Sequence, residues 1–213
     1  MTLSRTIVGF ALLHVSCMTA YSGDLVRSNS TILHRSKLTR SMSPDGQWEF
    51  FMKASAPAHE DDGPTMWIGG PHGRPAKLIG SLSRGAKMEW CPDGSCLLLL
   101  EEPSIEDMRI RLYRLGGSGP EAIPTLDRAI RADVQGSIGR GSQILFYALC
   151  TVGWFDSRHV LIAGEARYVR RGVNAPAQYF TAGYVIGTGS GRVVRRVSAS
   201  DLTTQYGFSK RIV

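Results

Sequence analysis

Long hydrophobic runs are missing from this sequence, and so are the short motifs of common catalytic and nucleotide-binding sites. Beyond the N-terminal segment, no stretch is apolar over the about 20 residues that a membrane-spanning helix needs, so we expect no transmembrane span in the mature chain. No phosphate-binding loop or dinucleotide fingerprint occurs. Residues 187–191 read Gly-Thr-Gly-Ser-Gly, with glycine where a nucleophile elbow has serine. We therefore expect no cofactor and no catalytic residue.

Aromatic residues are scarce, at 8% of the 213, whereas glycine occurs 24 times and proline 10 times. This composition, with scattered short apolar runs, is typical of many turns that join short strands. No long amphipathic helix is visible in the pattern, and the length is enough for one sizeable core. We therefore expect an all-β chain.

Histidine and cysteine are also few, with 5 and 4 residues. No histidine outside the N-terminal segment stands at ligand spacing from a cysteine, so we expect no metal site. The run His59-Glu60-Asp61-Asp62 lacks the alternating ligands of a calcium loop and reads as a solvated loop. His72 and His159 lie near turns and stay candidate ligand-binding residues.

The first residues have the three parts of a secretory signal. Arg5 lies in a short basic start, residues 7–15 form an apolar core, and Ala20-Tyr21-Ser22 provides small residues for cleavage. We predict a signal peptide over residues 1–22, a single domain over residues 23–213, and a periplasmic or secreted location. Residues 13–17 (Leu-His-Val-Ser-Cys) also loosely match a bacterial lipoprotein box, which leaves a lipid anchor at Cys17 as an alternative.

One turn motif occurs twice. Ser43-Pro44-Asp45-Gly46 precedes one apolar run, and Cys91-Pro92-Asp93-Gly94 precedes another, 48 residues later. A weaker third copy aligns "WCPDGSCLLLLE" from Trp90 with "WFDSRHVLIAGE" from Trp154. Proline sets the first corner, aspartate bonds nearby N–H groups and glycine accepts positive φ, so each copy predicts a hairpin.

A second strand–turn–strand follows each copy, which makes four strands per unit. This pattern predicts a small or incomplete β-propeller of about three to four blades, or an oligomer that completes the ring. The segment 127–150 fits no blade. A degenerate fourth unit, a short helix over residues 127–134 and an insertion all stay open for it.

The stretches "SPDGQWEFF" and "CPDGSCLLLL", each followed by a strand–turn–strand such as "RIRLYRLGGSGPEAIP", carry a family resemblance. They resemble the Pro-Asp-Gly variant of the WD-repeat β-propeller, as in TolB and the propeller domain of prolyl oligopeptidases. The resemblance covers roughly residues 33–202. It implies protein partners; peptidase activity is not carried over, because the triad of those enzymes lies on a separate domain.

Three cysteines remain outside the signal. Cys91 and Cys96 flank a tight turn, so an exported chain allows a disulfide across the hairpin neck. The third copy has Phe155 and Val160 at these positions, which favours two buried reduced thiols instead. Both options stay open, and Cys150 is left single.

The chain carries a net charge of +7, and arginine supplies 20 of its 25 basic residues. Such a charge favours anionic partners. The alternation of Arg109 and Arg111 with Ile110 and Leu112 predicts an outer edge strand. The basic cluster kept as a candidate anion-binding patch consists of Arg167, Arg170 and Arg171.

These features lead us to expect an exported, non-catalytic protein that binds or scaffolds another envelope protein or an anionic envelope polymer. The alternative is a small extracytoplasmic enzyme or binder for an anionic ligand such as a polysaccharide. A decayed propeller without independent function is a third option. Nucleic acid is not an expected partner, because export removes the chain from most of it and no recognition motif accompanies the charge.

Overall fold

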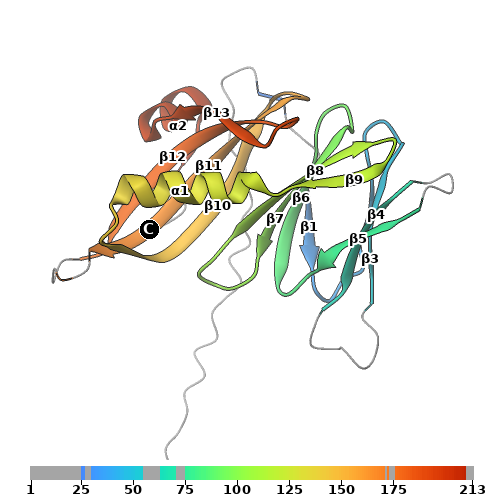
Figure 1. Ribbon diagram of the computed structural model, residues 1–213, viewed down its shortest axis with the longest axis horizontal. Helices are drawn as coiled ribbons and strands as arrows, with labels where there is room; N and C mark the ends of the chain where they lie inside the picture. Colours follow the sequence, from blue (N-terminus) through green and yellow to red (C-terminus); the bar gives the residue numbers. More distant parts are fainter. Residues whose placement is uncertain are drawn as a thin grey trace, which may run out of the picture.

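The computed structural model describes residues 25–26, 30–54, 63–70, 75–170, 172 and 176–209, and its strands form three antiparallel sheets in a row (Figure 1). The N-terminal sheet consists of β2 (Arg40–Met42), β3 (Glu49–Lys53), β4 (Thr65–Gly69) and β5 (Lys77–Ser81). The middle sheet consists of β1 (Ser30–His34), β6 (Gly85–Trp90), β7 (Cys96–Glu102), β8 (Arg109–Gly116) and β9 (Gly119–Ile123). The C-terminal sheet consists of β10 (Ser142–Asp156), β11 (His159–Arg170), β12 (Gln178–Gly187) and β13 (Arg192–Val197). The all-β prediction is confirmed; closure of a propeller ring is not seen among these residues.

Both Pro-Asp-Gly turns lie at the predicted bends between adjacent antiparallel strands. Residues 44–46 lie between β2 and β3, and residues 92–94 lie between β6 and β7. Gly46 and Gly94 have φ of 69° and 77°, a region that glycine enters without the steric cost other residues meet.

The residue before each proline organises its turn through one side-chain atom. Ser43 Oγ accepts the backbone N–H of Trp48 at 2.9 Å, and Cys91 Sγ accepts that of Cys96 at 2.9 Å. Each also donates to the aspartate two residues later, at 2.5 Å and 3.0 Å. The Cys91 thiol in the second unit thus makes the same two hydrogen bonds as the Ser43 hydroxyl in the first.

The third, weaker turn also lies where the alignment predicts. Trp154 precedes the bend from β10 to β11 as Trp90 precedes the bend from β6 to β7. Successive turns touch: a Cβ on Gly94 would lie 2.5 Å from Asp45 Oδ1, and the Ser157 hydroxyl donates to Asp93. The three hairpin bends, one from each sheet, therefore lie next to one another.

The middle sheet is buried on both faces. Leu98 and Leu100 belong to the hydrophobic cluster shared with the C-terminal sheet, whereas Leu97 and Leu99 belong to the cluster shared with the N-terminal sheet. All four are at most 2% exposed, and each contributes about 1.5 to 3 kcal/mol through burial. Because successive side chains of a strand point to opposite faces, one leucine run joins three sheets.

Two N-terminal pieces depart from the expected four strands per unit. β1 pairs with β6 and adds a fifth strand to the middle sheet, while Val26 forms an isolated bridge with Trp154 of β10. The Val26 N–H donates to the Trp154 carbonyl at 2.7 Å. In the expected pattern β6 and β10 are the first strands of their units, and their outer edges have no partner. β1 and Val26 supply hydrogen-bond partners to these two edges.

The expectation of no long amphipathic helix is wrong. Helix α1 (Thr125–Ile138) occupies the segment that fitted no blade and extends beyond the short helix considered for residues 127–134. Its buried residues recur every fourth position and pack between the middle and C-terminal sheets, namely Leu126, Ile130, Val134 and Ile138. One apolar residue per turn gave a stripe too narrow to stand out in the sequence.

A second helix covers the outer face of the C-terminal sheet. In α2 (Ala199–Tyr206), Ser198 caps the first turn by accepting the Asp201 N–H at 3.1 Å. Leu202 and Phe208 are buried in a cluster with residues of β10, β11 and β12. Within the described part of the chain, no helix is long and apolar enough to cross a membrane.

Candidate functional site

A groove of about 410 Å³ lies where the outer edge of the N-terminal sheet meets the middle sheet. It is open to solvent along β5, β8 and β9, and cationic side chains stand among apolar ones. The groove is lined by Lys77, Leu78, Ile79, Arg109, Ile110, Arg111, Leu112, Tyr113, Pro120, Ala122, Ile123, Pro124 and Asp127.

The groove exists because β9 covers only part of β8. Pairing between the two strands runs from Leu112 to Gly116, and after Ile123 the chain turns into α1. The backbone N–H of Ile110, left without a strand partner, donates to Asp127 Oδ1 of α1 at 3.1 Å. The Asp127 carboxylate of α1 thus accepts a β8 hydrogen bond at a position that β9 does not reach.

A bulge in β5 forms the facing wall. The register between β4 and β5 shifts at Ile79, which has no direct partner, and its carbonyl accepts bonds from the middle sheet. Arg111 Nη1 donates to this carbonyl at 2.9 Å, and the Tyr113 hydroxyl donates at 3.2 Å. Gly80 follows with φ of 146°, and a Cβ there would lie 2.9 Å from Arg111 Nη1. The hydrogen bonds to this bulge therefore join the N-terminal sheet to the middle sheet.

Arg111 also forms an ion pair with the buried carboxylate of Glu101. Its Nε lies 2.8 Å from Glu101 Oε2, and the Glu101 side chain is 8% exposed. Burial raises the pKa of Glu101, and the charges of Arg111 and Arg109 work in the opposite direction. Among the described residues, the other oxygen of Glu101 has no hydrogen-bond partner.

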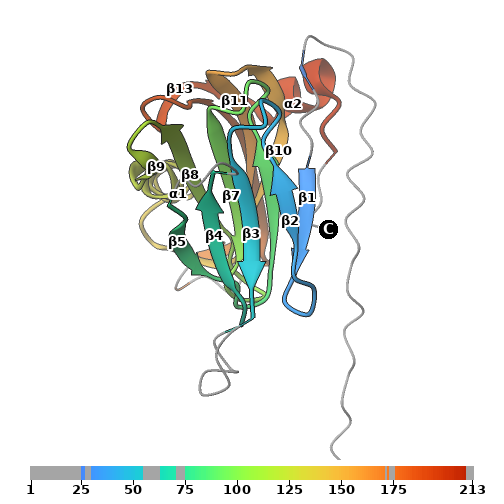
Figure 2. The same cartoon turned by 90° about the vertical axis from the view of Figure 1, so that its right-hand side faces the viewer.

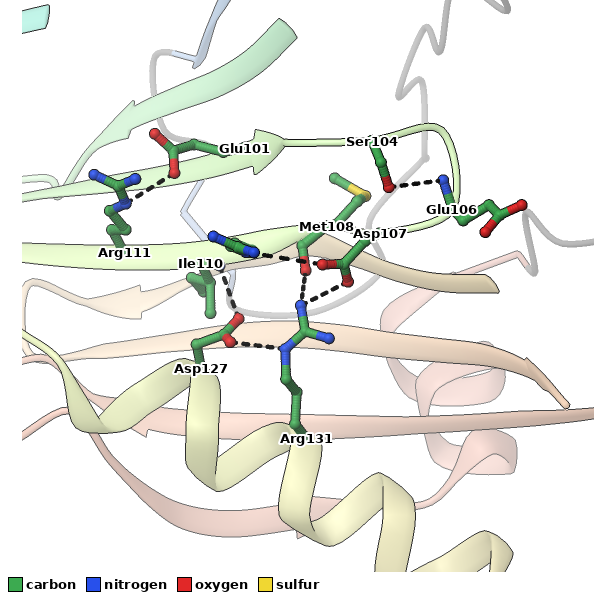
Figure 3. A network of polar contacts seen from close by, with 10 residues as sticks. Glu101, Ser104, Glu106, Asp107, Met108, Ile110, Arg111, Asp127 and Arg131 are labelled. Carbon is green, nitrogen blue, oxygen red and sulfur yellow. Dashed lines mark hydrogen bonds and ion pairs between the residues drawn. The ribbon is translucent and has the colours of Figure 1, made fainter. Parts of the chain in front are cut away.

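The rim of the groove near α1 is a network of ion pairs (Figure 3). Arg131 lies 2.7 Å from both Asp127 and Asp107 and also donates to the Met108 carbonyl. Its guanidinium lies 4.4 Å from the centroid of the Tyr147 ring. These contacts hold Asp127 in place, so its carboxylate is engaged and poorly suited to act as a general base.

The cations of the groove differ in how firmly they are held. Lys77 Nζ donates to the Pro120 carbonyl at 3.0 Å, so it spans from β5 to β9. Among the described residues, Arg109 forms a loose ion pair with Asp107, at 3.8 Å, and its side chain is 57% exposed. Arg109 is therefore the groove cation best able to turn toward an incoming anion.

The prediction of an outer edge strand for Arg109 and Arg111 is wrong in part. Both arginines share one face opposite Ile110 and Leu112, as the alternation indicated, but β9 lies beyond β8 from Leu112 onward. Sequence reasoning missed the groove because Lys77 and Arg109 belong to different units. Only the stacking of two sheets brings them together.

Two of the predicted ligand-binding residues, His159 and Arg170, lie at opposite ends of one strand. His159 begins β11 and Arg170 ends it, so they are roughly 37 Å apart at about 3.4 Å per residue. Arg167 and Arg170 are exposed, while His159 pairs with Asp156 at 3.1 Å and its hydrogen bond lowers the pKa of that carboxyl. Residues 1–22 with Cys17, residues 59–62, His72 and Arg171 lie outside the described residues.

Cys91 and Cys96 are buried free thiols in the structure, and Cys150 is buried as well. A hydrogen bond with Cys96 lowers the pKa of Cys91, and the same bond, together with burial, raises the pKa of Cys96. The two sulfurs are thus neighbours in a reduced hairpin neck. Their bridge stays a prediction for the oxidised protein.

No protein-family model and no curated protein matches the chain. Among solved structures, it is similar to the Pyrococcus horikoshii acylaminoacyl peptidase, with 14% identity, a TM-score of 0.39, and 76% of this chain and 25% of that chain covered. It is also similar to an acylaminoacyl peptidase in complex with Z-Gly-Gly-Phe-chloromethyl ketone, with 13% identity, a TM-score of 0.41, and 78% and 26% covered. The chain spans about a quarter of the length of these structures. Both likenesses are partial, and no activity follows from them.

Proposed function

We propose that the protein is an exported, non-catalytic member of the Pro-Asp-Gly variant of the WD-repeat β-propellers. In this proposal it binds a partner in the bacterial cell envelope, and the groove between its N-terminal and middle sheets takes an anionic group of that partner. The observation that carries the proposal is the placement of Lys77, Arg109 and Arg111 on one groove, where the described lining residues include a single carboxylate, Asp127.

Charge and geometry support binding over catalysis. The carboxylate of Asp127, which is the only one among the described residues that line the groove, accepts a backbone N–H and pairs with Arg131, so it is not free to abstract a proton. The exposed guanidinium of Arg109 offers the planar fork of donors that suits carboxylate, phosphate or sulfate. The net charge of +7 adds a favourable field for anions.

The test is charge reversal in the groove. Purified mature protein is titrated with polygalacturonate, dextran sulfate and polyphosphate by calorimetry, with neutral dextran for comparison. The Lys77→Glu/Arg109→Glu double variant should bind the preferred anion at least about tenfold more weakly, which corresponds to about 1.4 kcal/mol. Arg192→Glu, at an exposed position of β13, is the single-charge control and should bind as the wild type does.

Two results would contradict the proposal. One is that no anionic probe binds saturably to the folded wild type. The other is that Arg192→Glu, which changes the net charge by two units, loses at least half of the binding free energy that the groove variant loses by changing it by four, because this would mean that only net charge matters.

A further inference from the structure

The N-terminal sheet has one face that no other part of the described chain covers. Its inward residues, such as Phe50 and Met66, pack in the cluster shared with the middle sheet. Figure 2 looks onto the opposite face, where β5, β4, β3 and β2 lie next to one another. On this outward face, Met42 and Leu78 are 46% and 50% exposed.

One row of side chains crosses this face from edge to edge. Arg40 pairs with Phe51, Phe51 with Trp67, and Trp67 with Leu78, so each of the four strands contributes one residue. Four neighbouring strands give the row a width of about 14 Å. We call Arg40, Phe51, Trp67 and Leu78 the aromatic row.

The two rings of the aromatic row are parallel, with an interplanar angle of 5° and centroids 6.4 Å apart. The Trp67 indole N–H donates to Thr65 Oγ1 at 3.0 Å, so its polar group is already used. What Trp67 offers to a ligand is therefore the apolar ring, which attracts C–H groups and cations.

Cations lie over these rings. Lys53 Nζ is 4.5 Å from the Trp67 centroid and 5.4 Å from the Phe51 centroid. The Arg40 guanidinium is 5.6 Å from the Phe51 centroid and pairs with Glu49 at 3.1 Å. Both are long side chains at exposed positions, so they can keep an anion close to the rings.

Comparison with the middle sheet shows that this face is not built for another sheet. Glu49 and Phe51 occupy the positions of Leu97 and Leu99, 48 residues later, which are fully buried against the N-terminal sheet. A dry sheet-to-sheet contact in this chain therefore uses leucine where the outward face has a charge and an aromatic ring. Such a mixture suits a hydrated, amphipathic and anionic ligand better than an apolar partner.

We propose that the aromatic row with Lys53 binds an anionic saccharide chain. The C–H faces of successive sugar rings would pack on Phe51 and Trp67, and carboxylate or sulfate groups would pair with Lys53 and Arg40. This inference deepens the proposed function by naming a ligand class, and Leu78 belongs both to the row and to the lining of the groove. The aromatic row and the groove cations are separate residues, so each can fail without the other.

The experiment titrates the mature wild type with polygalacturonate oligosaccharides, and with neutral dextran and poly-glutamate as comparisons. Trp67 is the reporter, because the other three tryptophans are buried and its indole fluorescence should change on binding. Trp67→Ala should bind at least tenfold more weakly by calorimetry. Lys53→Glu keeps both rings and should lose a similar factor at low salt, with a smaller loss at high salt.

Tyr179→Ala is the matched control, because Tyr179 is an aromatic residue on β12 that is 45% exposed. It should bind as the wild type does, and thermal unfolding should show that all variants are folded. Wild-type affinity in Trp67→Ala and Lys53→Glu would overturn the saccharide surface. Poly-glutamate that binds as tightly as polygalacturonate would also overturn it and would indicate an acidic protein partner. The Lys77→Glu/Arg109→Glu variant reports on the groove alone. If this variant loses binding while Trp67→Ala and Lys53→Glu bind as the wild type does, the saccharide surface is overturned and the proposed function stands.

Discussion

The indole N–H of Trp154 donates to the Glu89 carboxylate at 3.2 Å, across the interface between the C-terminal and middle sheets. One unit earlier, the Trp90 indole donates to Ser41 Oγ at 3.0 Å, across the interface between the middle and N-terminal sheets. Ser41 and Glu89 are 48 residues apart, as are the two Pro-Asp-Gly turns. The repeat in the sequence therefore includes a repeated hydrogen bond that joins each sheet to the previous one.

Trp154→Phe should destabilise the protein more than Trp90→Phe, by about 1 kcal/mol in the free energy of unfolding. Both changes remove a similar apolar volume and one donor, but Trp154 serves a carboxylate, and hydrogen bonds to charged groups contribute more than those to neutral ones. Urea unfolding of the two variants beside the wild type measures the difference. Equal losses would show that the acceptor's charge does not matter here.

Gly80→Ala should cost about 1 to 3 kcal/mol of unfolding free energy. The backbone has φ of 146° at this position, and the added methyl would lie 2.9 Å from Arg111 Nη1. The substitution would therefore strain the backbone and disturb the hydrogen bond from Arg111 of β8 to the Ile79 carbonyl of β5. Gly116→Ala is the control, because nothing lies within 4 Å of its Cβ position, and it should stay within about 0.5 kcal/mol of the wild type. Equal effects of the two changes, measured by chemical unfolding, would contradict a close approach at Gly80.

The stability contributed by Glu101 should fall as pH rises through the acidic range. Burial raises the folded-state pKa of Glu101 above its unfolded value, so the folded protein holds the proton more tightly. The contribution is therefore fully present below the unfolded pKa and is lost as pH rises toward the folded pKa. The unfolding free energy of the wild type minus that of Glu101→Gln should decrease over this interval in a pH series of urea unfolding curves; an increase would reverse the sign of the shift.

Cys91→Ser should leave stability within about 1 kcal/mol of the wild type, because Ser43 holds the equivalent turn with a hydroxyl. Cys91→Ala should cost more, about 1 to 3 kcal/mol, since the buried N–H of Cys96 then loses its acceptor. Differential scanning calorimetry of the two variants gives the comparison. Serine and alanine variants of equal stability would mean that the sulfur does not organise this turn.

The elements that could be predicted are those set by near neighbours in the chain. Proline, aspartate and glycine in succession restrict the backbone to a tight turn, and both copies form one. The "CLLLL" run after Cys91-Pro92-Asp93-Gly94-Ser95 is apolar at every position, and it is buried on both faces of β7. Helix α1 was harder to find, because a single buried residue per turn leaves most of its surface polar.

The candidate site was not predicted, because its residues are distant in the sequence and are joined only by packing. Lys77 and Arg109 line one groove although they belong to successive units. His159 and Arg170, which are close in the sequence, are separated along an extended strand. Lys77 and Arg109 are thus far apart in the sequence but line the same groove, whereas His159 and Arg170 are closer in the sequence but far apart in space.

The sequence by itself determined the hairpin bends, the four-strand order of each unit and the faces on which apolar and charged residues alternate, because these depend on local backbone preferences and on the two-residue period of a strand. The tertiary structure alone decided which faces meet, where β9 leaves β8 and which face of the N-terminal sheet stays open. The physical reason is that stacking is a long-range contact between sheets: Leu97 and Leu98 are equally apolar, and only the arrangement of the neighbouring sheets assigns each to its own core.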